Sequence, residues 1–551
     1  MQPVSLVIAV AFLSGGCFSL WSASLTASIV FAFLAIAPRR GRKLVLPYSL
    51  PALVIFGVVA SYGASVFYAV DSSMALLGFV KMTAVAGFAV LSSQPENELG
   101  KNDVWNLVPL LGGCSVAVCL GGVLLSFFTG KSYFFQNDRL GGFFGYANTF
   151  ALWLLIGIVA LAFRDKWQRR HYAFFALSVC GIFLAISRSL AVISLFTLVL
   201  LFLLRPAARR LVATMTFAGL ALGAIVFLVR GMQGDYDRLL QTPDQAGEWL
   251  SRMVYYQDGI HLVASHPAGL GYLGYWYSQP AWQTAFYDTR FVHCSVLQYA
   301  IDIGVIPALA LAGLGVALLI SRKTPLMEKI VLALVCGHSL IDIDLEYLLL
   351  LFVICLCLPL RSSLVWETRT VVPSIVAVLL ALTHCYFGAA AFSADKGHPD
   401  LALALYPRNT EVLESQMMRV PALEEAVPYA RALIEQNDYA FLAMDTLARE
   451  SFSQGDIRKA AELKLDSLSI NRLLASDYLE LLSICAAGYD AAMRDDNFED
   501  AEYYRQLIVS IPGMMEQAGQ SLNKNAYRLK HKPELELPIQ ALEYIENFIK
   551  I

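Results

Sequence analysis

Long apolar runs with short polar connections fill most of the first 390 residues of the chain. A run of about 20 apolar residues is long enough to cross the hydrocarbon core of a bilayer as an α-helix. Hydrophobic residues make up 57% of the chain, a share typical of proteins that cross the membrane several times. We therefore expect an all-α fold, built on a polytopic membrane helix bundle of about 12–13 spans.

The distribution of Lys and Arg predicts how this bundle is oriented, because cytoplasmic connections are rich in both residues. Basic clusters occur at residues 39–43, 164–170, 205–210, 322–329 and 361–369. If all five are cytoplasmic, the spans lie near residues 4–20, 21–37, 44–69, 72–92, 104–127, 142–163, 173–187, 189–204, 211–229, 293–320, 330–342, 345–360 and 370–391. The N-terminus is then inside, and a large polar loop at about 230–292 and the C-terminus are outside.

Charge divides the chain into two domains. Residues 1–391 carry 25 Lys+Arg and 18 Asp+Glu, whereas residues 392–551 carry 16 and 26. The second part is an acidic, water-soluble tail in which Ala426, Ala460 and Ala501 follow polar turns at offsets of 34 and 41 residues. The first offset equals the tetratricopeptide period, so we expect extracytoplasmic helical repeats that bind a protein partner or brace a neighbouring domain.

Several classes of function are disfavoured by composition and motifs. The chain has no basic run of the kind that binds nucleic acid. Its ten cysteines form no CxxC pair and most lie inside apolar runs, so we expect no metal site. The glycine motif at 269–274 matches a dinucleotide fingerprint but follows no strand of a βαβ unit. We therefore expect these glycines to form tight turns, and we expect no cofactor.

One hairpin of spans is unusually short. Residues 173–204 hold a single charged residue, Arg188, between two clusters that both favour the cytoplasm. A tight hairpin with its tip at residues 187–189 has arms of about 15 residues, or about 22 Å, against about 30 Å of hydrocarbon. Arg188 is then expected below the outer surface, where it needs an anionic partner. It is either a snorkelling or salt-bridged arginine or a binding site for a phosphate.

Stretches with ionisable residues gather on the predicted outer side. They are residues 138–148 at the entrance of a span, the hairpin tip, the loop segment 252–272, the segment 292–304 and residues 338–344. Binding and catalytic residues concentrate in loops that a rigid scaffold positions. This distribution indicates a functional site on the outer face.

The order of these stretches resembles the O-antigen ligase and polymerase family of bacterial membrane glycosyltransferases, over roughly residues 130–345. Members show an Arg–Gly stretch that ends in Asn, a Ser-Arg pair, a loop with Arg and a Pro–Gly pattern, and a His before a Leu-Gln helix. The matching positions here are Arg139, Asn148, Arg188, Arg252, His293 and Gln298. One departure is Cys294, where the family usually has Asn.

The resemblance implies a bundle of the GT-C kind in the bacterial inner membrane. Its donor would be a glycan on a polyprenyl diphosphate, presented at the outer leaflet. Guanidinium groups bind phosphate oxygens bidentately, so Arg188 and Arg252, with Arg139 as a weaker candidate, are expected to bind the diphosphate. His293 would act on the acceptor hydroxyl as general base or orienting group. Direct attack would invert the anomeric carbon without a metal.

Further polar residues are candidates for supporting roles. They are Asn148, His266, Gln298, His338 and Asp342. His293 read alone fits an interfacial histidine, His266 a turn residue, and residues 338–344 a polar helix end.

Several functions stay open at this point. The acceptor is a lipid A core sugar (a ligase), a second lipid-linked glycan (a polymerase) or a protein hydroxyl, and the single large loop slightly favours the ligase. A flippase for lipid-linked glycans is the alternative from another class, although the chain lacks the internal symmetry that transporters often show. A membrane-anchored scaffold would leave the position of Arg188 unexplained.

Overall fold

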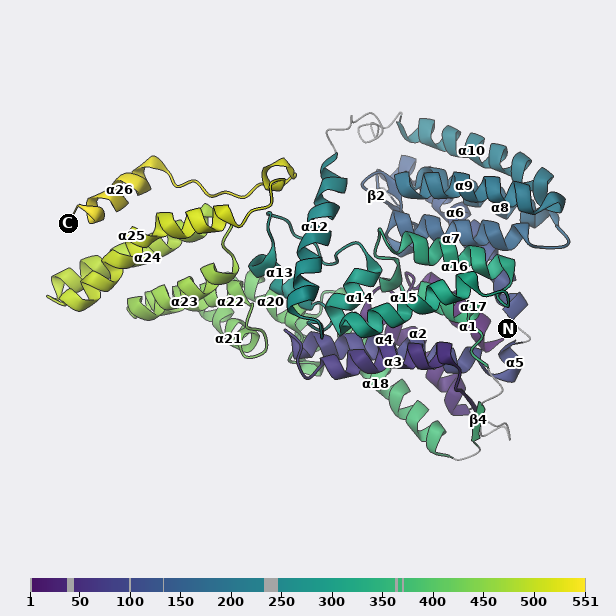
Figure 1. Ribbon diagram of the computed structural model, residues 1–551, viewed down its shortest axis with the longest axis horizontal. Helices are drawn as coiled ribbons and strands as arrows, with labels where there is room; N and C mark the ends of the chain where they lie inside the picture. The colour runs from purple at the N-terminus through teal and green to yellow at the C-terminus, as the bar shows by residue number, and fades with distance from the viewer. Residues whose placement is uncertain are drawn as a thin grey trace.

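The computed structural model describes residues 2–36, 44–98, 101–131, 133–231, 246–361, 365–368 and 371–550. Helices make up nearly all of the regular structure, and they form a bundle of long helices with a helical tail at one end (Figure 1). The expected all-α membrane fold is confirmed. The basic cluster at 39–43 and the first part of the large loop, residues 232–245, lie outside the described residues.

The bundle is formed by fourteen of the helices in the described part of the chain. They are α1 (Pro3–Leu13), α2 (Leu20–Ile36), α3 (Leu50–Ser65), α4 (Ser72–Ser92), α6 (Lys101–Thr129), α7 (Ala147–Ala162), α8 (Arg169–Leu184), α9 (Arg188–Leu204), α10 (Arg209–Gly231), α14 (Ser295–Ile303), α15 (Val305–Ile320), α16 (Leu326–His338), α17 (Leu348–Cys357) and α18 (Val372–Asp395). Two short antiparallel pairs join β1 (Leu44–Pro47) to β4 (Val365–Thr368) and β2 (Phe135–Gln136) to β3 (Arg139–Leu140).

Four helices in the described residues are by themselves long and apolar enough to cross a membrane. They lie at Ser72–Ser92, Lys101–Ser126, Pro206–Val229 and Val372–Asp395, and seven shorter apolar helices accompany them. The chain is therefore a membrane protein. Its thirteen spans and their orientation stay predictions.

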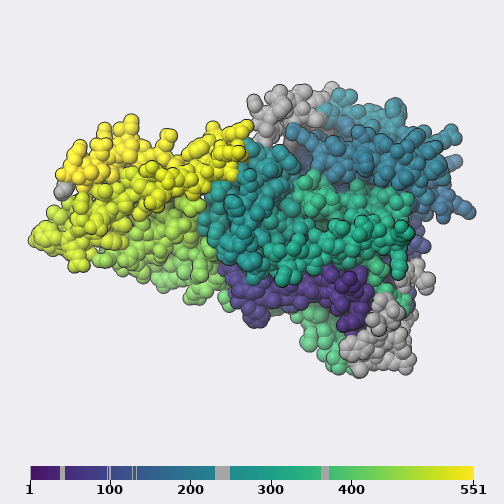
Figure 2. All heavy atoms as spheres, viewed as in Figure 1, coloured from purple at the N-terminus to yellow at the C-terminus, as the bar shows by residue number. Residues whose placement is uncertain are grey.

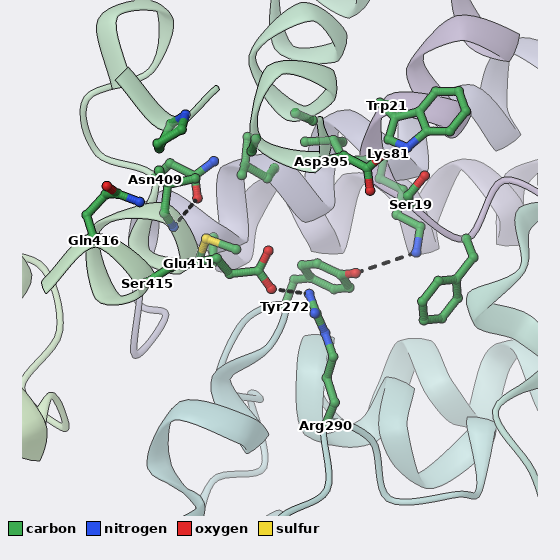
Figure 3. A pocket seen from close by; sticks show the side chains of 18 of the residues that line it. Ser19, Trp21, Lys81, Tyr272, Arg290, Asp395, Asn409, Glu411, Ser415 and Gln416 are labelled. Carbon is green, nitrogen blue, oxygen red and sulfur yellow. Dashed lines mark hydrogen bonds and ion pairs between the residues drawn. The ribbon is translucent and has the colours of Figure 1, made fainter. Parts of the chain in front are cut away.

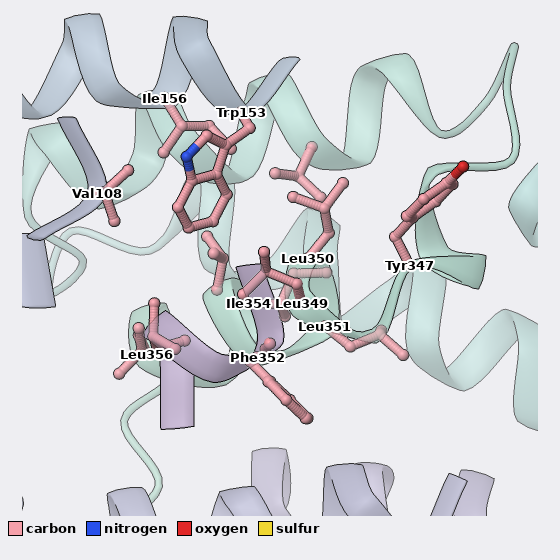
Figure 4. Close-up of a cluster of buried hydrophobic side chains, with 14 of the residues drawn as sticks. Val108, Trp153, Ile156, Tyr347, Leu349, Leu350, Leu351, Phe352, Ile354 and Leu356 are labelled. Atoms are coloured by element: carbon pink, nitrogen blue, oxygen red, sulfur yellow. The ribbon is translucent and has the colours of Figure 1, made fainter. Parts of the chain in front are cut away.

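The core of the bundle is apolar and continuous. Every residue of α7 is buried, as expected for a helix that is hydrophobic on all sides. Trp153 of α7 packs in a cluster with Ile156 and with Leu350 and Ile354 of α17 (Figure 4). Because α7 and α17 are held from all sides, the polar loops at their ends have fixed positions.

One expected span, at residues 293–320, is instead broken into α14 and α15. Gly304 separates them with φ 94° and ψ 166°, a conformation that only glycine adopts readily. A Cβ atom on Gly304 would lie 2.8 Å from the carbonyl oxygen of Pro267 and 2.9 Å from that of Ala268. The glycine-containing turn at 266–271 therefore packs into the break, and the single-helix prediction was wrong because this close approach is not visible as a break in hydrophobicity.

Another expected span, at residues 4–20, is also shorter than predicted. The helix α1 ends at Leu13, and Gly15 and Gly16 follow with positive φ angles of 84° and 71°. The chain then turns and enters α2 at Leu20. Phe18 and Ser19 thus lie in a connection between two helices rather than at the end of a span.

The large loop and the tail are helical too. The loop holds α12 (Ala246–Ser265) and α13 (Gly274–Trp282). The tail holds α19 (Pro399–Leu405), α20 (Thr410–Arg419), α21 (Leu423–Ile434), α22 (Phe441–Ser453), α23 (Ile457–Ile470), α24 (Ala475–Arg494), α25 (Phe498–Gln520) and α26 (Ile539–Ile549). The helix α18 continues to Asp395, across the boundary expected at residue 391, and the tetratricopeptide assignment stays a prediction.

The tail projects from one end of the bundle, which we call the tail end, and α12 and α13 lie between the two (Figure 2). Several contacts join the tail to the loop. The backbone N–H of Asn523 donates to the carbonyl of Thr284 at 2.7 Å. Val254, Ala285 and Tyr287 of the loop also pack in one apolar cluster with Ala526 and Leu529 of the tail.

Candidate functional site

The carboxylate of Asp342 lies at the centre of a polar cluster at the tail end of the bundle. Asp342 belongs to the loop between α16 and α17, and its side chain is fully buried. Oδ1 accepts a hydrogen bond from the Tyr146 hydroxyl at 2.6 Å and lies 3.4 Å from Nδ1 of His293. Oδ2 accepts from the Asn148 amide and lies 3.7 Å from the guanidinium of Arg252. Residues from the entrance of α7, from α12 and from the end of the large loop thus converge on one charge.

The surroundings of Asp342 keep it ionised. Burial opposes the charge, but hydrogen bonds from Tyr146 and Asn148 and the nearby guanidinium of Arg252 stabilise the ionised carboxylate. An ionised Asp342 is a strong acceptor in an interior where charge–charge interactions are weakly screened. It can therefore orient the guanidinium of Arg252 and the ring of His293.

His293 is held by its backbone as well as by its ring. It adopts φ 54°, a conformation uncommon outside glycine. The Tyr256 hydroxyl donates to its carbonyl at 2.9 Å, and Gln298 Oε1 accepts from the preceding N–H of Val292 at 3.0 Å. The Asp342 carboxylate at Nδ1 favours the tautomer with the proton on Nδ1, which leaves Nε2 as an acceptor. Gln298 thus supports the segment that carries His293.

Two arginines reach the cluster from opposite sides. The guanidinium of Arg252, on α12, donates to the carbonyl of Ile341 next to Asp342. Arg139, at the start of β3, donates through Nε to the carbonyl of Ala185 at 3.0 Å and through its terminal nitrogen to Asn148. The side-chain amide of Asn148 therefore links Arg139 to Asp342.

Arg188 stands at the tip of the predicted hairpin. The structure confirms a tight turn there, since α8 ends at Leu184, Ile186 has φ 47° and α9 begins at Arg188. Ser187 caps α9 by accepting from the N–H of Leu190 at 3.4 Å. Arg188 is exposed and forms no ion pair with any residue of the described segments. This geometry does not support the alternative in which Arg188 is a salt-bridged arginine.

A single cavity of about 590 Å³ brings the three arginines together. Arg139, Arg188 and Arg252 line it with Asn148 and Ile341. The rest of its wall is largely apolar and comes from α8, α9 and α10, with residues such as Ile182, Phe183, Leu195, Leu198, Leu220 and Phe227. We call it the arginine cavity. It offers fixed positive charge beside a hydrocarbon-like surface, which suits an anionic lipid headgroup and the start of its chain.

A comparison with protein families identifies the part of the chain that builds most of this cavity. Residues 173–313 match the O-antigen ligase family model. The chain carries an O-antigen ligase domain. No curated protein and no solved structure matches it.

The O-antigen ligase domain contains Arg188, Arg252 and His293, but the site extends beyond it. Asp342 lies C-terminal to the matched segment, and Arg139 and Asn148 lie N-terminal to it. His293 does not line the arginine cavity itself. It is joined to the cavity through Asp342, because two other contacts of this carboxylate, Arg252 and Asn148, line the cavity.

A second buried pair supports the hairpin of the O-antigen ligase domain. His338 Nδ1 lies 2.5 Å from Asp344, and its Nε2 lies 3.2 Å from the hydroxyl of Ser189. Thr149 donates to Asp344 at 2.9 Å. His338 and Asp344 are both buried. His338 is the last residue of α16 and Asp344 follows in the next loop, so the segment is a polar helix end whose buried side chains also contact the hairpin and α7.

His266 lies apart from these contacts. Its ring hydrogen-bonds the hydroxyl of Ser265 at 3.0 Å and packs edge-on against Trp282, and none of its contacts within the described residues reaches Asp342. Its carbonyl accepts from the N–H of Gly269. His266 is thus a turn residue in the segment that packs against the α14–α15 break.

Two polar residues near the site were not predicted to take part in it. The hydroxyl of Tyr146, next to the expected Asn148, donates to Asp342. Lys81 is buried in α4, where its amine lies 3.4 Å from Glu346. A lone lysine in an apolar run of 21 residues is itself a signal, because an ionisable group inside a span is costly and needs a partner.

Proposed function

We propose that this protein transfers a glycan from a polyprenyl-diphosphate carrier to an acceptor hydroxyl at the tail end of the bundle. The O-antigen ligase domain supports a glycosyltransferase of the ligase or polymerase type. The observation that carries the finer proposal is the arginine cavity, in which three guanidinium groups meet an apolar wall. A diphosphate headgroup and an isoprenoid chain match these two surfaces.

The residues of the cluster suggest how the transfer proceeds. The acceptor oxygen attacks the anomeric carbon while the bond from that carbon to the diphosphate oxygen breaks. Nε2 of His293 takes the hydroxyl proton, and Asp342 stabilises the resulting imidazolium. The lipid diphosphate leaves with the bonding electron pair, and Arg188, Arg252 and Arg139 stabilise its charge. A single displacement inverts the anomeric configuration.

The arrangement also supports a location for the reaction. All candidate residues lie at the tail end of the bundle, away from the basic clusters at 164–170, 205–210 and 322–329. We place this end outside the bacterial cytoplasmic membrane, together with the tail, and the N-terminus inside. The donor would then meet the site from the outer leaflet.

The proposal is tested with the purified full-length protein in nanodiscs. The protein is incubated with a polyprenyl-diphosphate oligosaccharide and, in parallel, with lipid A core, a second lipid-linked glycan or an acceptor protein. We expect one acceptor to gain the glycan, with release of polyprenyl diphosphate detected by mass spectrometry. The acceptor that is modified separates ligase from polymerase and from protein glycosylation.

A second measurement separates transfer from transport. The protein is reconstituted in vesicles with the donor, and movement of the donor between leaflets is followed. Movement between leaflets without any glycan transfer to the three acceptors would overturn the proposal in favour of a flippase.

A further inference from the structure

A second cavity of about 450 Å³ lies where the bundle, the large loop and the tail meet (Figure 3). We call it the junction cavity. Phe18, Ser19 and Trp21 line it from the α1–α2 region, and Lys81 lines it from α4. The large loop contributes Tyr272, Arg290 and Phe291, and α20 with the residue before it contributes Asn409, Glu411, Ser415 and Gln416. It shares no lining residue with the arginine cavity.

Most of the charged residues that line the junction cavity have an ion-pair partner. Lys81 pairs with Glu346 at 3.4 Å, and its amine lies 5.5 Å from the ring centres of both Phe18 and Tyr272. Arg290 forms an ion pair with Glu411 across the loop–tail boundary. Asp395 pairs at 2.9 Å with Lys396, which does not line the cavity, and the exposed Arg419 forms no ion pair with any described residue. Most of the lining charges are therefore neutralised in pairs, and the cavity lacks the three guanidinium groups that line the arginine cavity.

The uncharged groups of the cavity combine aromatic faces with hydrogen-bonding side chains. Trp21 and Tyr272 present partly exposed rings, and Figure 3 shows Tyr272 beside Glu411 of α20 and Trp21 on the opposite side of the cavity, near Asp395. Gln416 offers an amide that is both donor and acceptor and has no partner in the described part of the chain. A sugar ring has an apolar C–H face that packs on an aromatic ring and a rim of hydroxyls that needs donors and acceptors. The lining matches this chemistry.

The junction cavity lies close to the Asp342 cluster. Phe291 lines it and is two residues from His293. The ring of Phe18 stacks on Tyr347 with centres 4.8 Å apart, and Tyr347 stacks on Tyr146, which donates to Asp342. A stack of three aromatic rings, Phe18, Tyr347 and Tyr146, thus connects the cavity to the carboxylate that holds His293.

We infer that the junction cavity binds a saccharide unit of the acceptor glycan, and that α20 of the tail forms one wall of this site. The inference rests on the proposed function, because a displacement needs the acceptor to approach from the side opposite the leaving diphosphate. The arginine cavity suits the diphosphate, and the junction cavity is a separate space with lining suited to sugar. The tail then contributes residues to the acceptor site.

The test uses two substitutions from different walls, Trp21→Ala and Gln416→Ala, in the full-length protein. Gln506→Ala is the matched control, since Gln506 is an exposed glutamine on α25 that does not line the cavity. The probe is the lipid-free acceptor oligosaccharide, and its binding is measured by calorimetry in nanodiscs. We expect both cavity variants to raise the Kd at least tenfold and Gln506→Ala to change it less than twofold. Trp21→Phe keeps a ring and should recover part of the affinity.

Steady-state transfer provides a second readout. The cavity variants should raise KM for the acceptor at least tenfold while changing KM for the donor less than twofold. Unchanged acceptor binding in both variants, or a rise confined to the donor KM, would overturn the inference.

The inactive variant His293→Ala keeps the two proposals apart. It should bind the oligosaccharide as the unsubstituted protein does, because His293 does not line the junction cavity. If His293→Ala transfers normally, the proposed chemistry fails. The binding data for Trp21→Ala and Gln416→Ala then still decide the saccharide site.

Discussion

The carboxylate of Asp342 organises side chains that are far apart in the sequence. Tyr146 and Asn148 precede it by 196 and 194 positions, and His293 precedes it by 49. Removing one partner of a buried, hydrogen-bonded charge leaves the other uncompensated, which is strongly destabilising. The roles of His293 and Arg252 are therefore coupled, since both face the same carboxylate.

For His293→Ala we expect a loss of transfer of about 10²–10⁴-fold, the range typical for removal of a general acid–base group. The protein should still accumulate in the membrane, because Tyr146, Asn148 and Arg252 still stabilise the Asp342 carboxylate and the His293 side chain is partly exposed. Transfer of radiolabelled glycan checks the rate. His261→Ala is the matched control, since His261 is exposed on α12. Equal losses in both variants would contradict a specific role for His293.

For Arg188→Lys we expect at least a tenfold drop in kcat/KM for the donor, because a point charge cannot replace a bidentate fork on phosphate. Tenfold corresponds to about 1.4 kcal/mol of transition-state stabilisation. Arg322→Lys, at an exposed position in a predicted cytoplasmic cluster, provides the control. Donor kinetics at saturating acceptor give the comparison, and an unchanged value for Arg188→Lys would reject bidentate binding.

At the scale of elements, the break between α14 and α15 fixes the end of the large loop. The N–H groups of Leu270 and Gly271 donate to the carbonyls of Ile301 and Asp302 at 2.7 and 2.9 Å. These bonds tie the glycine turn to the last residues of α14, and α14 begins two residues after His293. The backbone of the turn therefore helps to set the position of the histidine.

The break itself is testable through two glycines of neighbouring sequence. Gly304→Ala should destabilise the protein by about 1–3 kcal/mol, because its backbone conformation is nearly restricted to glycine. Gly313→Ala, inside α15 with open space around its Cβ position, should be neutral or stabilising by up to about 1 kcal/mol. Thermal unfolding of the purified protein measures both. Equal changes in Tm for the two variants would show that the break does not require glycine at position 304.

Some features of these elements follow from local sequence, whereas others depend on contacts between distant segments. The sequence pointed to Arg139, Arg188 and His293 at the ends of apolar runs and to Arg252 in the large loop, and the hairpin at Arg188 followed from its length. The roles of these four residues stay predictions. The central place of Asp342 was not predictable, because it depends on how the α16–α17 loop folds back onto the entrance of α7. The break at Gly304 was missed for the same reason, since the carbonyls that exclude a Cβ atom come from residues 267 and 268.

On the scale of the whole molecule, the tail braces the loop that carries the site. Asp71, which caps α4, accepts a hydrogen bond from Thr410 at 2.5 Å, and Asn523 and Leu529 contact the loop near Thr284 and Tyr287. These contacts come from both ends of the tail. The loop is thus held between the bundle and the tail.

Deletion of residues 397–551 should therefore reduce transfer at least tenfold and make residues 266–292 sensitive to protease. Deletion of residues 538–551 alone is the control, because α26 packs on the tail's own core at its far end (Figure 1). Transfer assays and limited proteolysis followed by mass spectrometry measure the two effects. Full activity of the larger deletion would show that the tail is not needed to hold the loop.

The separation of the two cavities has a consequence for how such proteins diversify. The arginine cavity is built mainly from residues 139–252, whereas one wall of the junction cavity comes from residues 409–419. Recombination that exchanges the tail would then alter one cavity and leave the other intact. Chimeras that carry the α19–α20 segment of a relative offer a route to new pairings of donor and acceptor without rebuilding the membrane bundle.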